Sequence, residues 1–175
     1  ARYAIAVSNC TAALHLSLMA LGIKKNDEVI IPDLTFVADA NAILACNAKP
    51  VVADINKDNF FLSLSNVKKS ITKRTKAIIP VHIYGQVCNI DEILDIAKDN
   101  NIKVVEDCAH AIGTFHKSKH VGTLGSTGCF SFYPTKNITT AEGGMVTTNS
   151  KEIAEKVRQL RSHGMTKSLK SRYSS

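Results

Sequence analysis

The sequence predicts an α/β fold with a mostly parallel, mixed sheet and helices on both faces. Two observations lead to this prediction. Over about the first 110 residues, short β-branched apolar runs alternate with longer amphipathic stretches, which is typical of parallel strands connected by helices. The last two apolar runs follow one another without a helical stretch between them. The sheet is therefore expected to become mixed at that end.

The expected strands are short and almost entirely apolar, as strands covered on both faces are. The first five are expected at 4–7, 28–31, 49–53, 76–81 and 103–106. The two strands that follow without an intervening helix are expected at 128–132 and 145–148.

The stretches between the first five strands predict helices, because their apolar residues recur at helical spacing. These helices are expected at 11–22, 37–46, 64–71 and 90–100. A last helix, at 151–163, follows the final strand and carries apolar residues at 153, 154, 157 and 160. No repeat or low-complexity tract divides the chain.

Composition favours an ordinary globular domain with an anionic ligand. The chain has 175 residues, of which 45% are hydrophobic, and a net charge of +7, so it is long enough to bury one core. Its lysines and arginines are scattered and are not interleaved with aromatic residues, which argues against a nucleic-acid partner. The excess positive charge would still attract an anion such as a nucleotide diphosphate.

The cysteines and apolar runs bear on compartment. Five cysteines, at 10, 46, 88, 108 and 129, include no CxxC pair, so neither a zinc site nor a redox disulfide is expected. A reducing, cytoplasmic compartment fits best. No apolar run reaches the roughly 20 residues that a membrane span requires, so no membrane partner is expected.

The two ends of the chain suggest a piece of a longer protein. The apolar segment Tyr3–Val7 begins almost at the first residue, which is Ala1. The last segment, Met165–Ser175, is polar and has no closing apolar element. We therefore expect residues on both sides of the chain to be missing.

Functional residues are expected directly after the strands, because ligands of open α/β sheets bind at the carboxyl ends of the strands. After the first strand, small polar residues at 8–13 open a helix. Free backbone N–H groups there, with the Thr11 hydroxyl, could hold a phosphate. Ser8 or Thr11 as a simple helix N-cap is the alternative.

After the strand at 103–106 come two carboxylates and a histidine, Glu106, Asp107 and His110. A partly desolvated acid at a strand end suits the protonated nitrogen of a heteroaromatic cofactor. The alternative is that Asp107 caps a helix. His110 could face the same ligand if a turn follows the strand, or it could be a packing or surface residue.

After the strand at 128–132, a proline-marked turn presents Lys136 five residues beyond Ser131. A partly desolvated lysine can form a Schiff base, although a plain surface lysine is the alternative. The adjacent glycines Gly143 and Gly144 could let the backbone approach a ligand, or could simply form a turn.

Taken together, these segments resemble the DegT/StrS family of sugar aminotransferases, which are fold-type I pyridoxal-phosphate enzymes. The resemblance extends from Val7 to about Thr166. It is densest in the segments Thr11–Leu16, Gly22–Pro32, Thr35–Ala38, Thr75–Gly85, Glu106–Ala111 and Ser131–Gly144.

The resemblance implies a role for each candidate residue toward pyridoxal 5'-phosphate. Lys136 would form the Schiff base and move the proton, and Asp107 would pair with the pyridinium nitrogen. His110 stands where the family often has glutamine, near the phenolic oxygen. The other cofactor contacts would be the phosphate ligands Ser131, Cys10 and Thr11 and the stacking ring of Phe36. Cys10 departs from the glycine usual in the family, which leaves the conformation of that loop open.

The resemblance also implies an activity and an assembly. Residues 1–175 would be a cofactor-binding large domain without its C-terminal small domain, acting as a homodimer. The reaction would move an amino group, with glutamate as the donor, to a nucleotide-linked keto-sugar. A sugar dehydratase of the same family is an alternative, but it would carry histidine in place of Lys136. A non-catalytic regulator or nucleic-acid-binding protein is a second alternative.

Overall fold

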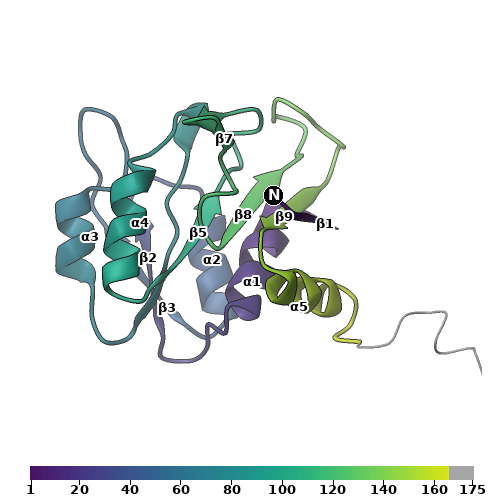
Figure 1. The fold of residues 1–175 in the computed structure, drawn as a ribbon, viewed down its shortest axis with the longest axis horizontal. Helices are drawn as coiled ribbons and strands as arrows, with labels where there is room; N and C mark the ends of the chain where they lie inside the picture. Colours follow the sequence, from purple (N-terminus) through teal and green to yellow (C-terminus); the bar gives the residue numbers. More distant parts are fainter. Residues whose placement is uncertain (166–175) are drawn as a thin grey trace, which may run out of the picture.

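A seven-stranded sheet forms the centre of the molecule. The structure is a computed structural model and describes residues 1–165. The strands lie side by side in the order β1-β9-β8-β5-β4-β2-β3 (Figure 1). Among them, β9 pairs antiparallel with both neighbours and every other pair is parallel. In chain order, the strands are β1 Tyr3–Val7, β2 Glu28–Pro32, β3 Lys49–Ala53, β4 Thr75–Ile78, β5 Lys103–Asp107, β8 Thr127–Ser131 and β9 Gly144–Thr148.

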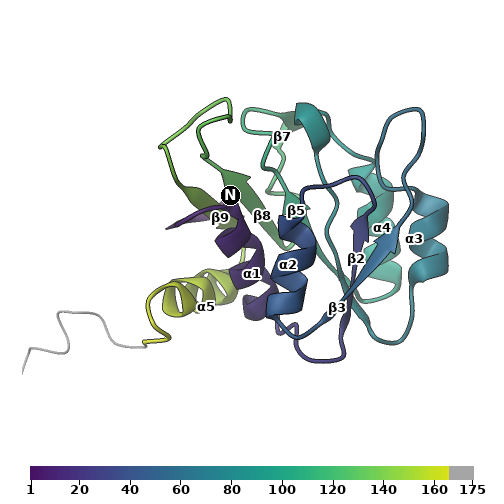
Figure 2. The ribbon, with the colours of Figure 1, turned by 180° about the vertical axis from the view of Figure 1, so that it is seen from behind.

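Helices cover both faces of this sheet (Figures 1 and 2). On one face lie α1 Cys10–Ala20, α2 Ala38–Ala45 and α5 Lys151–Arg161, which share one buried apolar cluster with the strands. On the other face lie α3 Leu64–Ser70 and α4 Ile90–Asp99, which contribute to a second cluster. Sequence and packing agree in α4, because Ile90, Ile93 and Ala97 recur at helical spacing and are all buried.

The direction of the strands determines where a site can form. Because only β9 runs against the others, six strands end at the same edge of the sheet. The segments that follow β1, β2, β4, β5 and β8 therefore meet there. This edge is the usual place for a ligand in an open α/β sheet.

The predicted fold class is confirmed, with small differences in element ends. The largest concerns the strand predicted at 76–81, which ends at Ile78. Pro80 has no backbone N–H to donate to a neighbouring strand, so the ladder is interrupted there. Pairing resumes at Val81, which forms an isolated bridge with Asp107.

Three short elements were not predicted. A hairpin of β6 Phe115–His116 and β7 Lys119–His120 follows β5, and a 3-10 helix, η1 Ile83–Gly85, follows Val81. Each has only two or three residues, which is too short to show a periodic pattern.

The ends of the chain add little to this description. The polar segment that suggested a longer protein lies outside the described residues, apart from Met165. Across residues 1–165, every helix is too short or too polar to span a lipid bilayer.

Candidate active site

A cavity of about 730 Å³ opens at the carboxyl edge of the sheet. This volume is in the range of small-molecule sites. All the cofactor-binding residues that the family resemblance implies line it, although they come from distant segments of the chain. These residues are Cys10, Thr11, Phe36, Asp107, His110, Ser131 and Lys136.

The N-terminus of α1 presents two free backbone donors to this cavity. Asn9 is the N-cap, and its Oδ1 accepts from Ala12 N at 2.8 Å while its carbonyl accepts from Ala13 N at 3.1 Å. The alternative that Ser8 or Thr11 is the N-cap is therefore wrong. Within residues 1–165, the N–H groups of Cys10 and Thr11 have no acceptor. With the positive end of the helix dipole, they form an anion-binding position.

Cys10 fits this position, although the family resemblance had led us to expect a glycine. Its backbone φ is not positive, so a side chain causes no strain there. Burial raises the pKa of the Cys10 thiol well above its usual value, and the nearby Asp107 raises it further. The thiol therefore stays neutral and does not repel an anion.

Asp107 places a carboxyl group at the buried side of the cavity. The residue is 5% exposed, and its Oδ1 accepts from Ala109 N at 2.8 Å. Burial raises its pKa, whereas the Ala109 N–H and the nearby His110 and Lys136 act to lower it. A turn and not a helix follows β5, so the alternative of a helix cap is wrong.

His110 is held by the 3-10 helix that follows β4. The backbone N–H of Tyr84 donates to its Nδ1 at 3.3 Å, and the two rings stack with centroids 5.8 Å apart. Partial burial lowers the pKa of His110, and the positive charge of Lys136 lowers it further, although Asp107 opposes this shift. Neutral imidazole is thus favoured beside the cavity.

Lys136 lies in the turn after β8 and is half-buried. Its backbone N–H donates to the carbonyl of Tyr133 at 2.9 Å. The N–H of Tyr133 in turn donates to Ser131 Oγ at 3.4 Å. Tyr133 therefore links the lysine to the buried end of the strand, where the Ser131 side chain also lines the cavity.

Gly144 allows β9 to pass directly under the α1 N-terminus. A Cβ added at Gly144 would stand 2.3 Å from the carbonyl carbon of Asn9 and 2.8 Å from Cys10 N. No side chain fits at such distances. The glycine pair was expected to permit either a close approach or a turn. Its second residue, Gly144, permits the backbone of β9 to approach the anion-binding loop closely.

Several lining residues were not singled out from the sequence. Thr35 follows β2, and Tyr84 follows the interrupted end of β4. The rule that ligands bind at strand ends could have indicated Thr35, which directly precedes Phe36. Tyr84 was hidden because η1 has no periodic pattern.

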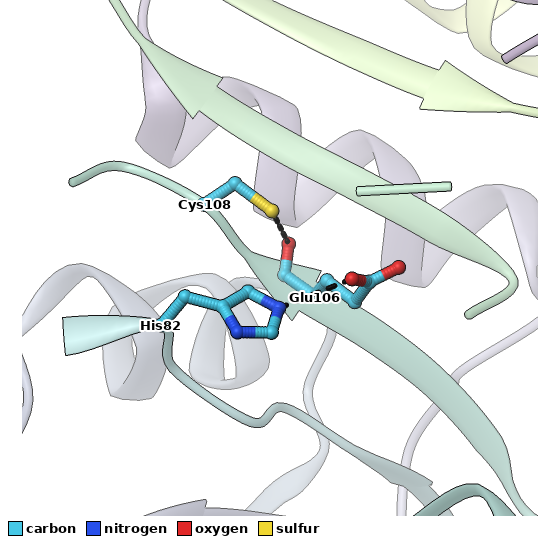
Figure 3. Close-up of side chains that lie close together, drawn as sticks. All are labelled: His82, Glu106 and Cys108. Atoms are coloured by element: carbon cyan, nitrogen blue, oxygen red, sulfur yellow. Dashed lines mark hydrogen bonds and ion pairs between the residues drawn. The ribbon is translucent and has the colours of Figure 1, made fainter. Parts of the chain in front are cut away.

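A buried cluster of His82, Glu106 and Cys108 lies beside the site (Figure 3). The Glu106 oxygens accept from the backbone N–H groups of residues 122, 124 and 125 at 2.7–2.8 Å, and from His82 Nε2 at 3.1 Å. Burial opposes ionisation of Glu106, but these hydrogen bonds prevail and hold its pKa below the usual value.

These bonds leave the cluster little capacity to bind a metal. The other His82 nitrogen, Nδ1, accepts from Cys88 N at 3.3 Å. Burial raises the pKa of the Cys108 thiol well above its usual value, and its Sγ donates to the backbone carbonyl of Glu106 at 3.7 Å. Glu106 instead anchors the loop between β7 and β8, and the neighbouring Asp107 is free to face the cavity.

Comparisons with known proteins show which sequences and folds the chain is similar to. The chain is 49% identical over 164 residues to GDP-perosamine synthase of Caulobacter vibrioides, covering 94% of this chain and 44% of that protein. It superposes on an aminotransferase from Psychrobacter cryohalolentis with a TM-score of 0.92 and 38% identity, covering 98% of this chain and 43% of that one. It also superposes on NtdA from Bacillus subtilis with bound cofactor PMP, with a TM-score of 0.84 and 36% identity. That match covers 90% of this chain and 36% of the other.

The chain thus spans less than half the length of the relatives that it matches. The sequence profile of the DegT/DnrJ/EryC1/StrS aminotransferase family matches residues 1–175, the whole of the chain. Together with the fold and the strand-end cavity, this match shows that the chain belongs to the DegT/DnrJ/EryC1/StrS aminotransferase family.

Proposed function

We propose that these residues form the cofactor-binding large domain of a pyridoxal-phosphate-dependent aminotransferase that converts a keto group on a nucleotide-linked sugar into an amino group. The observation that carries the proposal is the meeting of Asp107, Lys136 and the α1 N-terminus in one cavity. A buried acid, an amine and an anion-binding position are the three groups that this cofactor needs. They come from segments that only the fold brings together.

The relatives support the assignment. One is named GDP-perosamine synthase, and the solved structure of NtdA has the bound cofactor PMP. Because the chain spans under half of their length, the complete activity is proposed for a longer protein. A small domain and a partner subunit would complete the site, and the homodimer would act in the cytoplasm. The five cysteines, all free and buried, fit a reducing compartment.

The residues at one end of the cavity would hold the phosphate. The free N–H groups of Cys10 and Thr11 are directed by the first turn of α1, and the hydroxyls of Thr11 and Ser131 add donors. Charge-assisted hydrogen bonds of this kind are the stronger ones in proteins. The neutral thiol of Cys10 adds no competing negative charge.

The remaining residues would hold the ring and move protons. When bound, the cofactor supplies an electron-withdrawing pyridine ring and an aldehyde that reacts with amines. Asp107 would hold the proton on the ring nitrogen, and His110 would donate to the phenolic oxygen. Phe36 would lie against the ring, and Lys136 would supply the amine that reacts with the aldehyde and the base that moves a proton at the substrate carbon.

Charge supports an anionic substrate. The net charge of +7 favours the approach of a nucleotide diphosphate by long-range attraction. Glutamate is the proposed amino donor, as the family resemblance implies. An amino acid and a keto-sugar would use the cavity in turn, because the amino acid would give its amino group to the cofactor and the keto-sugar would then receive it.

The test uses the full-length protein that contains this chain. After addition of pyridoxal phosphate, we expect a visible absorption band from the bound cofactor. Glutamate should then convert the cofactor to its aminated form, and this band should disappear. A panel of nucleotide keto-sugars, with products weighed by mass spectrometry, then identifies the substrate. A protein that binds no cofactor would be a regulator or nucleic-acid-binding protein, and loss of water without amino transfer would indicate a dehydratase.

A further inference from the structure

A second carboxyl group, that of Asp39, is buried close to Asp107. Asp39 lies in the first turn of α2 and is 0% exposed. Its Oδ2 accepts a short hydrogen bond from the hydroxyl of Thr35, which lines the cavity. Its Oδ1 is buried and has no partner among the described residues. An unpaired buried oxygen is rare and requires a physical explanation.

Ionisation of Asp39 is strongly opposed. Burial raises its pKa well above the usual value, and the negative charge of Asp107 raises it further. The hydrogen bond from Thr35 acts in the other direction. The N-terminal end of α2 also favours a negative charge, but a helix dipole is weak compared with the loss of water around a buried carboxylate. Asp39 is therefore expected to be neutral.

The surroundings of the two acids decide which one carries the charge. Asp107 receives the Ala109 N–H and lies near the positive charge of Lys136. Asp39 has only the Thr35 hydroxyl. The titratable groups around Asp39 are Asp107 on β5, Cys10 on α1 and Cys129 on β8. Asp107 is also affected by the charges of His82, His110 and Lys136. Both thiols are neutral because burial raises each pKa.

We propose that Asp39 is a positioning residue that keeps a proton on its unpaired oxygen, so that the buried pair carries a single negative charge and this charge rests on Asp107. The proposal rests on the proposed function, in which Asp107 must be ionised to hold the ring-nitrogen proton. Two like charges in a buried site do not both ionise readily, and one acid takes up the proton. Asp39 serves as that acid.

A protonated Asp39 would do more than avoid a second charge. Asp107 is the charged group that acts most strongly on Asp39, but Asp39 Oδ1 makes no hydrogen bond to it or to any other described residue. The O–H would therefore act on Asp107 as a dipole, which stabilises the ionised carboxylate when its positive end is turned toward that group. The effect reaches the substrate only through Asp107, so Asp39 would tune the site without touching the reacting atoms.

The first test detects the proton directly and does not need bound cofactor. Infrared spectra of the full-length protein at neutral pH, with and without ¹³C-labelled aspartate, should show the carbonyl stretch of a buried carboxylic acid. We expect this band to be present in the wild type, absent in Asp39→Asn and unchanged in Asp95→Asn. Asp95 is an exposed residue of α4, so its variant is a matched control.

The second test separates positioning from simple packing. Asparagine is neutral and can donate, as a protonated aspartate can, whereas leucine cannot. Asp39→Asn should keep turnover within about threefold of wild type, and Asp39→Leu should lower it about tenfold. The ¹⁵N resonance of ring-labelled cofactor should stay at the protonated position in Asp39→Asn and move toward the unprotonated one in Asp39→Leu. Thermal melting confirms which variants are folded.

The outcomes separate this proposal from the proposed function. Absence of the acid band that depends on Asp39 would overturn the positioning role, even in a fully active aminotransferase. Equal damage from asparagine and leucine would also overturn it, because Asp39 would then act as a carboxylate. Failure of the wild type to retain cofactor would contradict the proposed function. The proposed effect of Asp39 on the ring nitrogen would then be lost as well. The infrared spectrum would still show where the proton lies.

Discussion

The backbone N–H of Tyr84 donates to Nδ1 of His110 at 3.3 Å, which determines the tautomer of the histidine. A neutral imidazole whose Nδ1 accepts carries its proton on Nε2. Tyr84 reaches this position with a left-handed backbone, at φ 53°, where a bulky residue is strained. His110 is therefore set up as a neutral donor through Nε2.

His110→Gln should preserve cofactor binding, because the amide N–H can replace the Nε2 donor. The pKa of His110 lies below its usual value of about 6.5. In the wild type, we therefore expect a change in the cofactor spectrum as the pH falls below this value, and the change should be missing in His110→Gln. The free energy of unfolding should also decrease as the pH falls below this value. The reason is that His110 takes up its proton at a higher pH in the unfolded chain than in the folded one. His110→Leu, without a donor, should bind more weakly. An identical acid transition in wild type and His110→Gln would contradict the assignment.

Lys136→Ala should abolish covalent attachment of the cofactor and lower turnover by about a thousandfold or more, while leaving the fold intact. Lys136→Arg keeps a positive charge near Asp107 but should fail equally, because a guanidinium group does not act as the amine. Borohydride reduction followed by peptide mass mapping checks the site. Labelling of a different lysine would refute the role of Lys136.

Asp107→Asn should lower turnover by about a hundredfold or more while weakening cofactor retention much less. The physical reason is that an amide cannot hold the positive charge of the ring nitrogen, whereas the phosphate contacts of α1 remain. Steady-state kinetics and equilibrium dialysis measure the two effects, with Asp95→Asn as the control. Near-normal turnover would mean that Asp107 only closes the turn to Ala109.

Gly144→Ala should disturb the phosphate position. The new Cβ would overlap the backbone of Asn9 at 2.3 Å, so the loop must move and stability should fall by about 2 kcal/mol. Gly143→Ala is the matched control, because its closest contact is the hydroxyl end of the Thr140 side chain, which can rotate away. Urea unfolding and the affinity for the phosphorylated cofactor should both differ between Gly144→Ala and Gly143→Ala. Equal behaviour of the two variants would show that the close approach to Asn9 is unimportant.

Residues 1–175 produced alone should be inactive and should bind the cofactor weakly. Phe36 and Tyr84, at the cavity, are 73% and 72% exposed, so water reaches the site and screens its polar contacts. Such exposed apolar surface also favours aggregation. Equilibrium dialysis and a half-reaction with glutamate, on this piece and the longer protein in parallel, provide the test. Equal affinity and equal amino transfer would show that 175 residues are a complete catalytic unit.

The sequence indicated the fold and the edge of the sheet that holds the cavity because both follow from strong local patterns. Buried parallel strands are nearly all apolar, so β2 and β5 stand out from their surroundings. The polar residues that follow such strands, Asp107 among them, could then be assigned to one edge before any contact was known. Lys136 was distinguished by its place after a strand and a proline.

Other features depend on contacts that no local pattern reveals. The choice of Asn9 over Ser8 as the cap depends on backbone angles at the end of β1. Asp39 looks like an ordinary polar position in a helix, and its burial arises only when α2 packs against α1 and β2. Tyr84 takes its position from a strained turn. Each of these is a tertiary effect that overrides local preference.

The pairing of β1 with β9 has a consequence for biosynthesis. Tyr3 lies opposite Thr148 in this ladder, so the first strand must wait for nearly the whole described chain before it finds its neighbour. At ribosomal speeds the delay is on the order of ten seconds. During that time the loop at Asn9 has no β9 beneath it, and an edge of β1 stays open to other chains. The site for the phosphate is thus one of the last parts to close, and a chain halted before residue 144 would leave β1 without its partner β9.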